Sequence, residues 1–97
     1  MYTTNNLLAE QAFNKLQVKH IINTSSFEVL TVSLEAGSLF PEHVSPKNSY
    51  LLMLEGEIHF NIDNRTFHLM PQQVFDFPAN TKHFVKALTN SKFLIIR

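Results

Sequence analysis

Apolar and polar residues alternate over most of the chain, in short segments separated by residues that favour turns. In residues 26–34, for example, Leu30, Val32 and Leu34 fall on one face of an extended strand, and the residues between them fall on the other. The segments are rich in β-branched and aromatic residues, and their centres lie roughly 8–12 residues apart, which is typical of a β-sandwich or barrel. The pattern therefore predicts strands at residues 18–22, 26–34, 38–44, 50–54, 57–62, 65–69, 74–77, 83–87 and 92–96.

Helical periodicity is weak throughout the chain. No segment shows the apolar spacing of a long amphipathic helix. Asn6 could cap a short helix that continues through Ala9, Ala12, Phe13 and Leu16. The prediction is an all-β domain with at most one short N-terminal helix.

The clearest local feature is the Asp63-Asn64 pair between two alternating segments. Both residue types tolerate left-handed backbone angles, so we expect a two-residue type I′ hairpin. This turn fixes the register and puts four apolar residues on one face, namely Ile58, Phe60, Phe67 and Leu69. His59 and His68 then sit side by side on the outer face. Such a pair could chelate a soft divalent ion, but it is more often part of a solvated or interface surface.

The composition is that of one small folded domain, and we expect residues 1–97 to form a single unit. Apolar residues make up 44% of the chain and charged residues only 16%, which excludes an intrinsically disordered chain. Because there is no cysteine, disulfides and cysteine-ligated zinc are excluded.

The charge balance bears on the partners. Eight basic residues balance eight acidic ones, so we expect no nucleic-acid partner. A neutral, charge-poor surface on a small domain favours self-association. The first residues do not read as a secretion signal, and the longest apolar run is residues 50–54, so we expect a cytoplasmic protein that does not associate with membranes.

Residues 37–56 contain a distinctive spacing of glycine and histidine. Gly37 is followed by His43, and the segment closes on Gly56. Both glycines follow the end of a predicted strand, where a positive φ angle is expected. The segment resembles the first conserved motif of the cupin superfamily.

Residues 72–87 are similar to the second cupin motif, with Pro78 and His83 at the expected intervals. The resemblance places Gln72 where the family has a glycine. The two motifs occur in the family's order, with a short hairpin between them. They imply an RmlC-like double-stranded β-helix, an antiparallel jelly-roll barrel with a pocket at one end. They also imply pairing through the β-sheets, so we expect a homodimer.

The main departures from the family concern its metal ligands. Ser45 stands where the family has a second histidine, and Ser49 where it has glutamate, so the resemblance leaves only His43 and His83 of four usual ligands. Two neutral imidazoles would leave a divalent ion at +2 inside an apolar barrel, whereas a glutamate would lower that charge. Two interpretations stay open. One is a weakly held Zn, Ni, Fe or Mn ion completed by water, and the other is a metal-free pair satisfied by the serines or by water.

Strand alternation predicts which side chains face the pocket. If Ser49 faces inward, Leu51 and Met53 do so as well, and Val85 and Ala87 follow His83. The predicted lining comprises Ser45, Ser49, Leu51, Met53, Val85 and Ala87, with His43 and His83 as the metal ligands. A mostly apolar cavity with a few hydrogen-bonding groups is typical of a small-molecule site, although a barrel this small could also be packed full.

Three functions are compatible with these residues. The main expectation is a barrel that binds a small molecule or a weakly held divalent metal, without strong catalytic activity. The first alternative is an enzyme acting on a small polar substrate. It would be an oxygenase that uses a metal, or an isomerase or epimerase whose histidine base is oriented by Asp76. The second alternative is a structural or regulatory dimer with a filled barrel.

Overall fold

The computed structural model describes all 97 residues, which form one short helix, nine strands and the segments that connect them. The elements are α1 (Leu7–Glu10), β1 (Leu16–Asn23), β2 (Glu28–Leu34), β3 (Leu39–His43), β4 (Ser49–Glu55), β5 (Ile58–Ile62), β6 (Arg65–Leu69), β7 (Val74–Phe77), β8 (His83–Ala87) and β9 (Ser91–Ile96). The predicted all-β fold is confirmed. Every predicted strand is present, and its ends differ from the prediction by at most two residues.

The N-terminal helix is shorter than the sequence suggested. It ends at Glu10, and the side chain of Asn6 makes no capping hydrogen bond. Gln11 already has an extended backbone, and Leu16 begins β1. No helix of the protein is long and apolar enough to cross a membrane.

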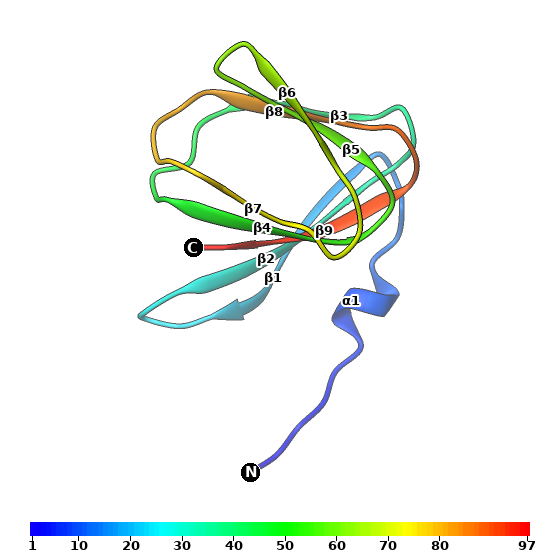
Figure 1. The fold of residues 1–97 in the computed structure, drawn as a ribbon. Coiled ribbons are helices and arrows are strands. Elements are labelled where there is room, and N and C mark those ends of the chain that lie inside the picture. The colour runs from blue at the N-terminus through cyan, green and yellow to red at the C-terminus, as the bar shows by residue number, and fades with distance from the viewer.

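The strands form two antiparallel sheets that face each other. The five-stranded sheet has the order β1-β2-β9-β4-β7, and the four-stranded sheet has the order β3-β8-β5-β6. In Figure 1 the four-stranded sheet lies above and the five-stranded sheet below. Some neighbouring strands, such as β3 and β8 or β4 and β7, are far apart in the chain, so residues of the two sequence motifs meet on adjacent strands. The architecture is the predicted jelly-roll barrel.

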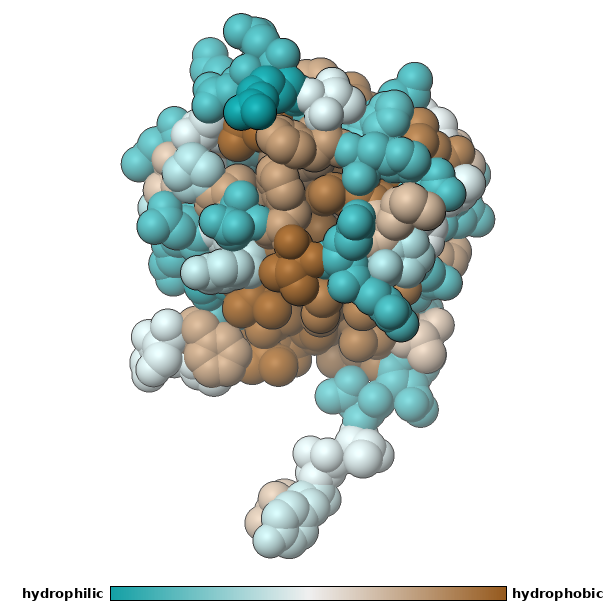
Figure 2. Space-filling model, viewed as in Figure 1, coloured by the Kyte–Doolittle hydropathy of each residue, from teal (hydrophilic) through white to brown (hydrophobic).

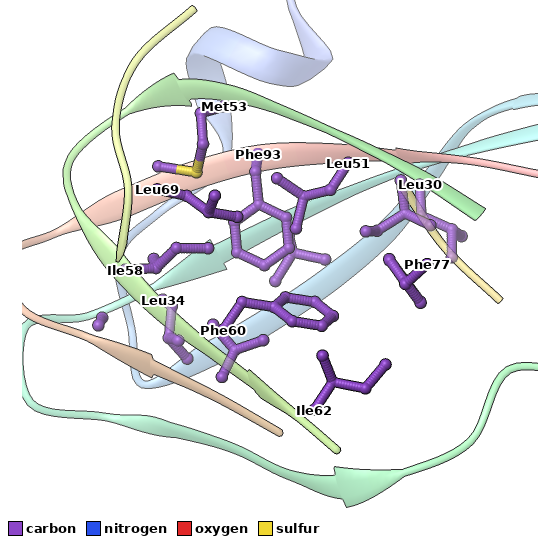
Figure 3. Close-up of a cluster of buried hydrophobic side chains, with 14 residues drawn as sticks. Leu30, Leu34, Leu51, Met53, Ile58, Phe60, Ile62, Leu69, Phe77 and Phe93 are labelled. Carbon is purple, nitrogen blue, oxygen red and sulfur yellow. The ribbon is translucent and has the colours of Figure 1, made fainter. Parts of the chain in front are cut away.

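The core lies between the sheets and draws on both of them. It comprises Leu30, Val32, Leu34, Leu51, Met53, Ile58, Phe60, Ile62, Leu69, Phe77, Val85, Ala87, Phe93 and Ile95. Figure 3 shows Phe60 and Phe93 in the middle of this cluster, and each is only 1% exposed. Each fully buried side chain of this kind stabilises the fold by about 1.5–3 kcal/mol. Strand alternation directs these side chains to the inner faces of both sheets, so closure of the barrel is favoured because it buries them.

The turns have the backbone angles expected from their residue types. Asp63 and Asn64 have φ angles of 53° and 57°, and the strands on either side pair in the predicted register, with His59 opposite His68. Gly37 and Gly56 have φ angles of 82° and 84°. The backbone at Gln72 is also left-handed, so the turn that the family makes with glycine is made here by a larger residue.

Two buried polar side chains hold the N-terminal segment against the outer face of the five-stranded sheet. Gln11 is 2% exposed, and its Nε2 lies 3.2 Å from the carbonyl oxygen of Thr31 and 3.2 Å from Ser33 Oγ. Lys92 Nζ donates a hydrogen bond to the carbonyl oxygen of Leu8 at 2.6 Å. The chain before α1 projects away from the barrel (Figure 1).

Candidate functional site

A cavity of about 250 Å³ opens between the two sheets. Ten of its fifteen lining residues are hydrophobic, and none is acidic. The lining consists of Val18, Leu30, Val32, Phe40, His43, Val44, Ser45, Pro46, Phe60, Phe77, His83, Val85, Phe93, Ile95 and Arg97. The barrel is therefore not packed full, and its polar groups are few.

His43 and His83 meet across adjacent strands at this cavity. They are direct partners in the antiparallel pairing of β3 with β8, so both side chains point to the same face of the sheet. The centroids of their rings are 4.2 Å apart, and the ring planes are inclined at 65°. Thus the fold brings together the two histidines that the sequence motifs had selected.

Backbone hydrogen bonds fix the tautomer of each histidine. The Nδ1 of His43 lies 2.7 Å from the carbonyl oxygen of Pro41, and the Nδ1 of His83 lies 2.9 Å from that of Thr81. A carbonyl oxygen only accepts hydrogen bonds, so Nδ1 carries the proton in both rings. In the neutral imidazole Nε2 then holds a lone pair, and in neither ring does Nε2 have a protein partner. Neither atom is sealed inside the protein, and both histidines line the cavity.

Aromatic rings surround the two imidazoles. Phe40 stacks on His43 with the centroids 4.3 Å apart, and Phe60 stacks on His83 at 5.3 Å. Phe77 also contacts His83, at 4.7 Å. Burial lowers the pKa of His83, since desolvation disfavours the charged ring, and the neighbouring His43 lowers it further. The hydrogen bond to the Thr81 carbonyl acts in the opposite direction without reversing the effect, so His83 is neutral near pH 7.

The two serines at the motif positions are already engaged in hydrogen bonds. Ser45 Oγ donates to the carbonyl oxygen of Lys47 at 2.9 Å, and Ser49 Oγ donates to the same oxygen at 3.1 Å. Ser45 Oγ also accepts a hydrogen bond from the guanidinium of Arg97 at 3.0 Å. Arg97 Nε lies 3.2 Å from a carboxylate oxygen of Glu28, which holds the guanidinium in place.

Arg97 was not predicted as a site residue, because it lies outside both motifs. A signal was nevertheless present in the sequence. Phe93 and Ile95 face the cavity, and strand alternation carries this face on to residue 97. The aromatic residues of the lining were missed for a similar reason, since the prediction extended only from motif positions.

The structure divides the predicted pocket-lining residues into two groups. Ser45 and Val85 line the cavity together with His43 and His83. The other four, Ser49, Leu51, Met53 and Ala87, are buried as expected but do not line it. Leu51, Met53 and Ala87 instead belong to the packed core, as Figure 3 shows for the first two. Alternation predicts that a side chain points inward, but it does not predict whether that side chain lies in the packed core or lines the cavity.

Other candidate residues lie outside the cavity. Asp76 is exposed and pairs with Tyr50 across β4 and β7, on the side away from the core. It therefore cannot orient either cavity histidine. His59 and His68 lie on the outer face, with ring centroids 5.4 Å apart, and His68 Nε2 lies 3.1 Å from Glu57 Oε2. No group of three or more His, Cys, Asp or Glu side chains has a geometry suited to a metal ion.

Comparison with known proteins agrees with this geometry. A protein family model described as "Cupin domain" matches residues 30–96, which include both motifs and the cavity strands. The chain belongs to the cupin family. None of the curated proteins matches the chain.

Several solved structures are similar to this cupin. An RmlC-like cupin protein from Desulfovibrio desulfuricans has 24% sequence identity and a TM-score of 0.85, over 99% of this chain and 95% of that one. A cupin superfamily protein from Desulfitobacterium hafniense has 20% identity and a TM-score of 0.84, over 99% and 90%. An RmlC-like cupin with a double-stranded β-helix fold from Methanocaldococcus jannaschii has 18% identity and a TM-score of 0.80, over 91% and 83%. At these identities the likeness establishes the fold.

The donor set of this cupin does not fit a metal ion of the kind that its motifs imply. His43 and His83 have the free Nε2 atoms that ligands need, but the other two motif positions supply neutral hydroxyls that bond to the Lys47 carbonyl. The guanidinium of Arg97 bonds to Ser45 Oγ, so a fixed positive charge stands beside the place where a cation would have to bind. Glu28 is paired with Arg97, and the lining contains no carboxylate that could bind the ion itself.

Proposed function

We propose that this cupin is a binding protein that holds one small, largely apolar organic molecule in the cavity between its sheets. The observation that carries the proposal is the composition of the lining, in which ten hydrophobic side chains surround a few polar groups. Cavities of this composition are the usual sites for small ligands. The two Nε2 atoms also support the proposal, because neither has a hydrogen-bond partner within the protein. At a partly enclosed site, such an atom needs a hydrogen bond from a ligand or from water.

The volume limits the size of the ligand. A water molecule takes up about 30 Å³ in the liquid, so a cavity of about 250 Å³ has room for about eight waters. This suits a molecule with a single ring better than a nucleotide or an oligosaccharide. A catalytic role is not part of the proposal. Neither an acidic residue nor a complete metal-ligand set lies beside the histidines to assist them.

Toluene is a suitable first probe, because dry apolar cavities bind small aromatic hydrocarbons. We expect saturable changes in the amide NMR spectrum that are confined to cavity residues such as Val32, Phe60 and Val85. Val44 and Leu39 give a matched pair of variants, since they are 49% and 50% exposed but only Val44 lines the cavity. Val44→Phe should weaken toluene binding, and Leu39→Phe should leave it unchanged.

Two results would argue against this function. If toluene causes no localised changes at any concentration, the cavity is closed in solution and the alternative of a structural domain gains support. If protein purified without a tag contains a stoichiometric transition metal that is lost in His43→Ala, the site is a metal centre despite its incomplete ligand set.

We also propose that the protein forms homodimers through the outer face of its five-stranded sheet. Tyr50 and Leu52 of β4 pair with Ile96 and Leu94 of β9, and Val74 lies opposite Leu52 on the other side. Tyr50 is 55% exposed and Val74 is 65% exposed, so the face is apolar but uncovered. Figure 2 views the molecule between its two sheets, where hydrophobic residues also gather over the middle and lower part. A second copy is the partner we propose because the chain has no net charge, so two copies do not repel each other.

Sedimentation equilibrium tests the proposed dimer. Val74→Lys should shift the protein towards the monomer, because dimerisation would then bury an unpaired charge. Phe84→Lys is the control, since Phe84 is a partly exposed apolar residue on the outer face of the other sheet. A wild-type protein that remains monomeric at high concentration would contradict the proposal. The predicted cytoplasmic location stays a prediction.

A further inference from the structure

The polar groups of the cavity are of two complementary kinds. Arg97 supplies the only permanent charge in the lining, and it is positive. His43 and His83 each have Nδ1 directed at a backbone carbonyl, which leaves Nε2 as the hydrogen-bond acceptor of a neutral imidazole. A ligand that matches the cavity therefore needs a negatively charged group and a hydrogen-bond donor.

The guanidinium of Arg97 has donors to spare. Its Nε–H is directed to Glu28, and one N–H of Nη1 is directed to Ser45 Oγ. Nη2 has no protein partner, and an arginine presents five N–H groups in all. The bonds to Glu28 and Ser45 fix the plane of the guanidinium, so the free N–H groups are held ready for a planar anion. Carboxylate is the small organic anion that best matches this geometry.

The pair of histidines selects a second feature of the ligand. An Nε2 atom that carries no proton would face a carboxylate unfavourably, because neither partner would bring a proton. It would face a hydroxyl group favourably, since its O–H donates. A site built to bond a hydroxyl discriminates strongly against the analogue that lacks it, because its own polar atoms are then left unpaired.

We propose that the ligand is a small hydroxy acid with an apolar or aromatic body, whose carboxylate binds Arg97 and whose hydroxyl donates to the His43–His83 pair. The inference rests on the proposed binding function and narrows it to one chemical class. Phe40, Phe60 and Phe77 line the cavity beside the histidines and provide apolar contacts for the body of such a molecule. A cationic ligand finds no acidic side chain in the lining, because Glu28 lies outside it and is paired with Arg97.

A series of monocyclic aromatic probes separates this inference from the proposed function. Toluene tests only whether the cavity is available, benzoate adds the carboxylate, and phenol adds the hydroxyl. The three isomers of hydroxybenzoate carry both groups at different spacings. We expect at least one isomer to bind about tenfold or more tightly than either benzoate or phenol, as measured by calorimetry and by amide shifts at the cavity.

Two variants assign the groups. Arg97→Met keeps an apolar stem of similar length, and it should remove the advantage of hydroxybenzoate over phenol. Arg65→Met is its control, because Arg65 is exposed and lies outside the cavity. His43→Phe keeps a ring against Phe40 but has no Nε2, and it should remove the advantage of hydroxybenzoate over benzoate.

The outcomes are distinct. If toluene and phenol bind at the cavity as tightly as every hydroxybenzoate isomer, the proposed function holds and the hydroxy-acid inference is wrong. The same conclusion follows if the best isomer binds Arg97→Met as tightly as it binds Arg65→Met. If no probe perturbs the cavity, both proposals fail together.

Discussion

Gly56 and Gly37 have the same backbone conformation but different surroundings, and this difference predicts the effect of adding a methyl group to each. Both have a positive φ angle, 84° at Gly56 and 82° at Gly37. A Cβ atom at Gly37 would meet nothing within 4 Å. A Cβ atom at Gly56 would lie 2.6 Å from the Cα of Ser91, and closer still to Ser91 Oγ and to the carbonyl oxygen of Asn90.

The surroundings of Gly56 cannot move aside at low cost. Ser91 is fully buried, and its Oγ accepts a hydrogen bond from the amide of Glu57 at 3.1 Å. The atoms nearest to the added methyl group are therefore backbone atoms and a hydroxyl held in place by hydrogen bonds. Relief of the clash would separate the turn before β5 from the start of β9.

The expected magnitudes follow from these contacts. A left-handed alanine costs about 1–2 kcal/mol, and the stiffer unfolded chain returns about 0.4–1 kcal/mol. Gly37→Ala should therefore lower the free energy of unfolding by at most about 1.6 kcal/mol. Gly56→Ala bears the same cost and adds about 1–3 kcal/mol for overpacking, which gives a loss of roughly 1–4.6 kcal/mol. For a domain with a stability of about 5–15 kcal/mol this is a large share.

Urea unfolding followed by far-ultraviolet circular dichroism measures both variants against the wild type. The clash predicts a lower midpoint for Gly56→Ala than for Gly37→Ala, with the same slope. If Gly56→Ala is insoluble while Gly37→Ala folds, the order still holds. Equal midpoints for the two variants would refute the reasoning, since backbone strain alone would then account for both.

Three further predictions concern other parts of the molecule. First, burial lowers the pKa of His83. As the pH falls below about 6.5, the unfolded chain therefore takes up a proton at His83 before the folded chain does, and stability is lost on acidification. The urea midpoints at about pH 7.5 and about pH 5.5 should differ less in His83→Phe than in the wild type, and an unchanged difference would assign the effect to other groups. Second, Lys92→Met removes the hydrogen bond to Leu8, so amide hydrogens of the N-terminal segment should exchange faster with solvent, while those of β9 change little. Unchanged exchange in the N-terminal segment would show that Gln11 alone anchors it. Third, Asn64→Val places a β-branched residue at a φ angle of 57° and should lower the free energy of unfolding by about 1–2 kcal/mol. Thr66→Val on the adjacent strand is the control and should have only a small effect. Equal losses in the two variants would contradict the left-handed turn.

The fold could be predicted because its signals are local and agree with one another. The Asp63-Asn64 turn and the alternation on both flanking strands specify one register, and the structure has it. The two motifs likewise brought His43 opposite His83. The sequence could not show which inward side chains would lie in the packed core and which would line the cavity. Leu51 and Met53 point inward as predicted, but they lie where the two sheets pack closely, and the cavity lies elsewhere.

Arg97 shows a second limit of the motif-based prediction. The motifs direct attention to positions where the family has ligands, and at one of these the chain has Ser45. The structure gives that serine a positively charged partner from the residue that follows β9, so the departure from the motif changes the character of the site and not only its ligand count. A contact of this kind depends on how β9 and the chain after β3 approach each other in space, which no local pattern records.

The packing of Phe60 and Phe77 around His83 gives the protein a natural magnetic reporter. Ring currents of the two phenyl groups act on the imidazole protons and should displace their resonances from those of a free histidine. His59 and His68 have only each other as ring neighbours, so their signals provide an internal reference. Any molecule that enters the barrel and displaces a phenyl ring, even slightly, should therefore be visible in a spectrum of unlabelled protein.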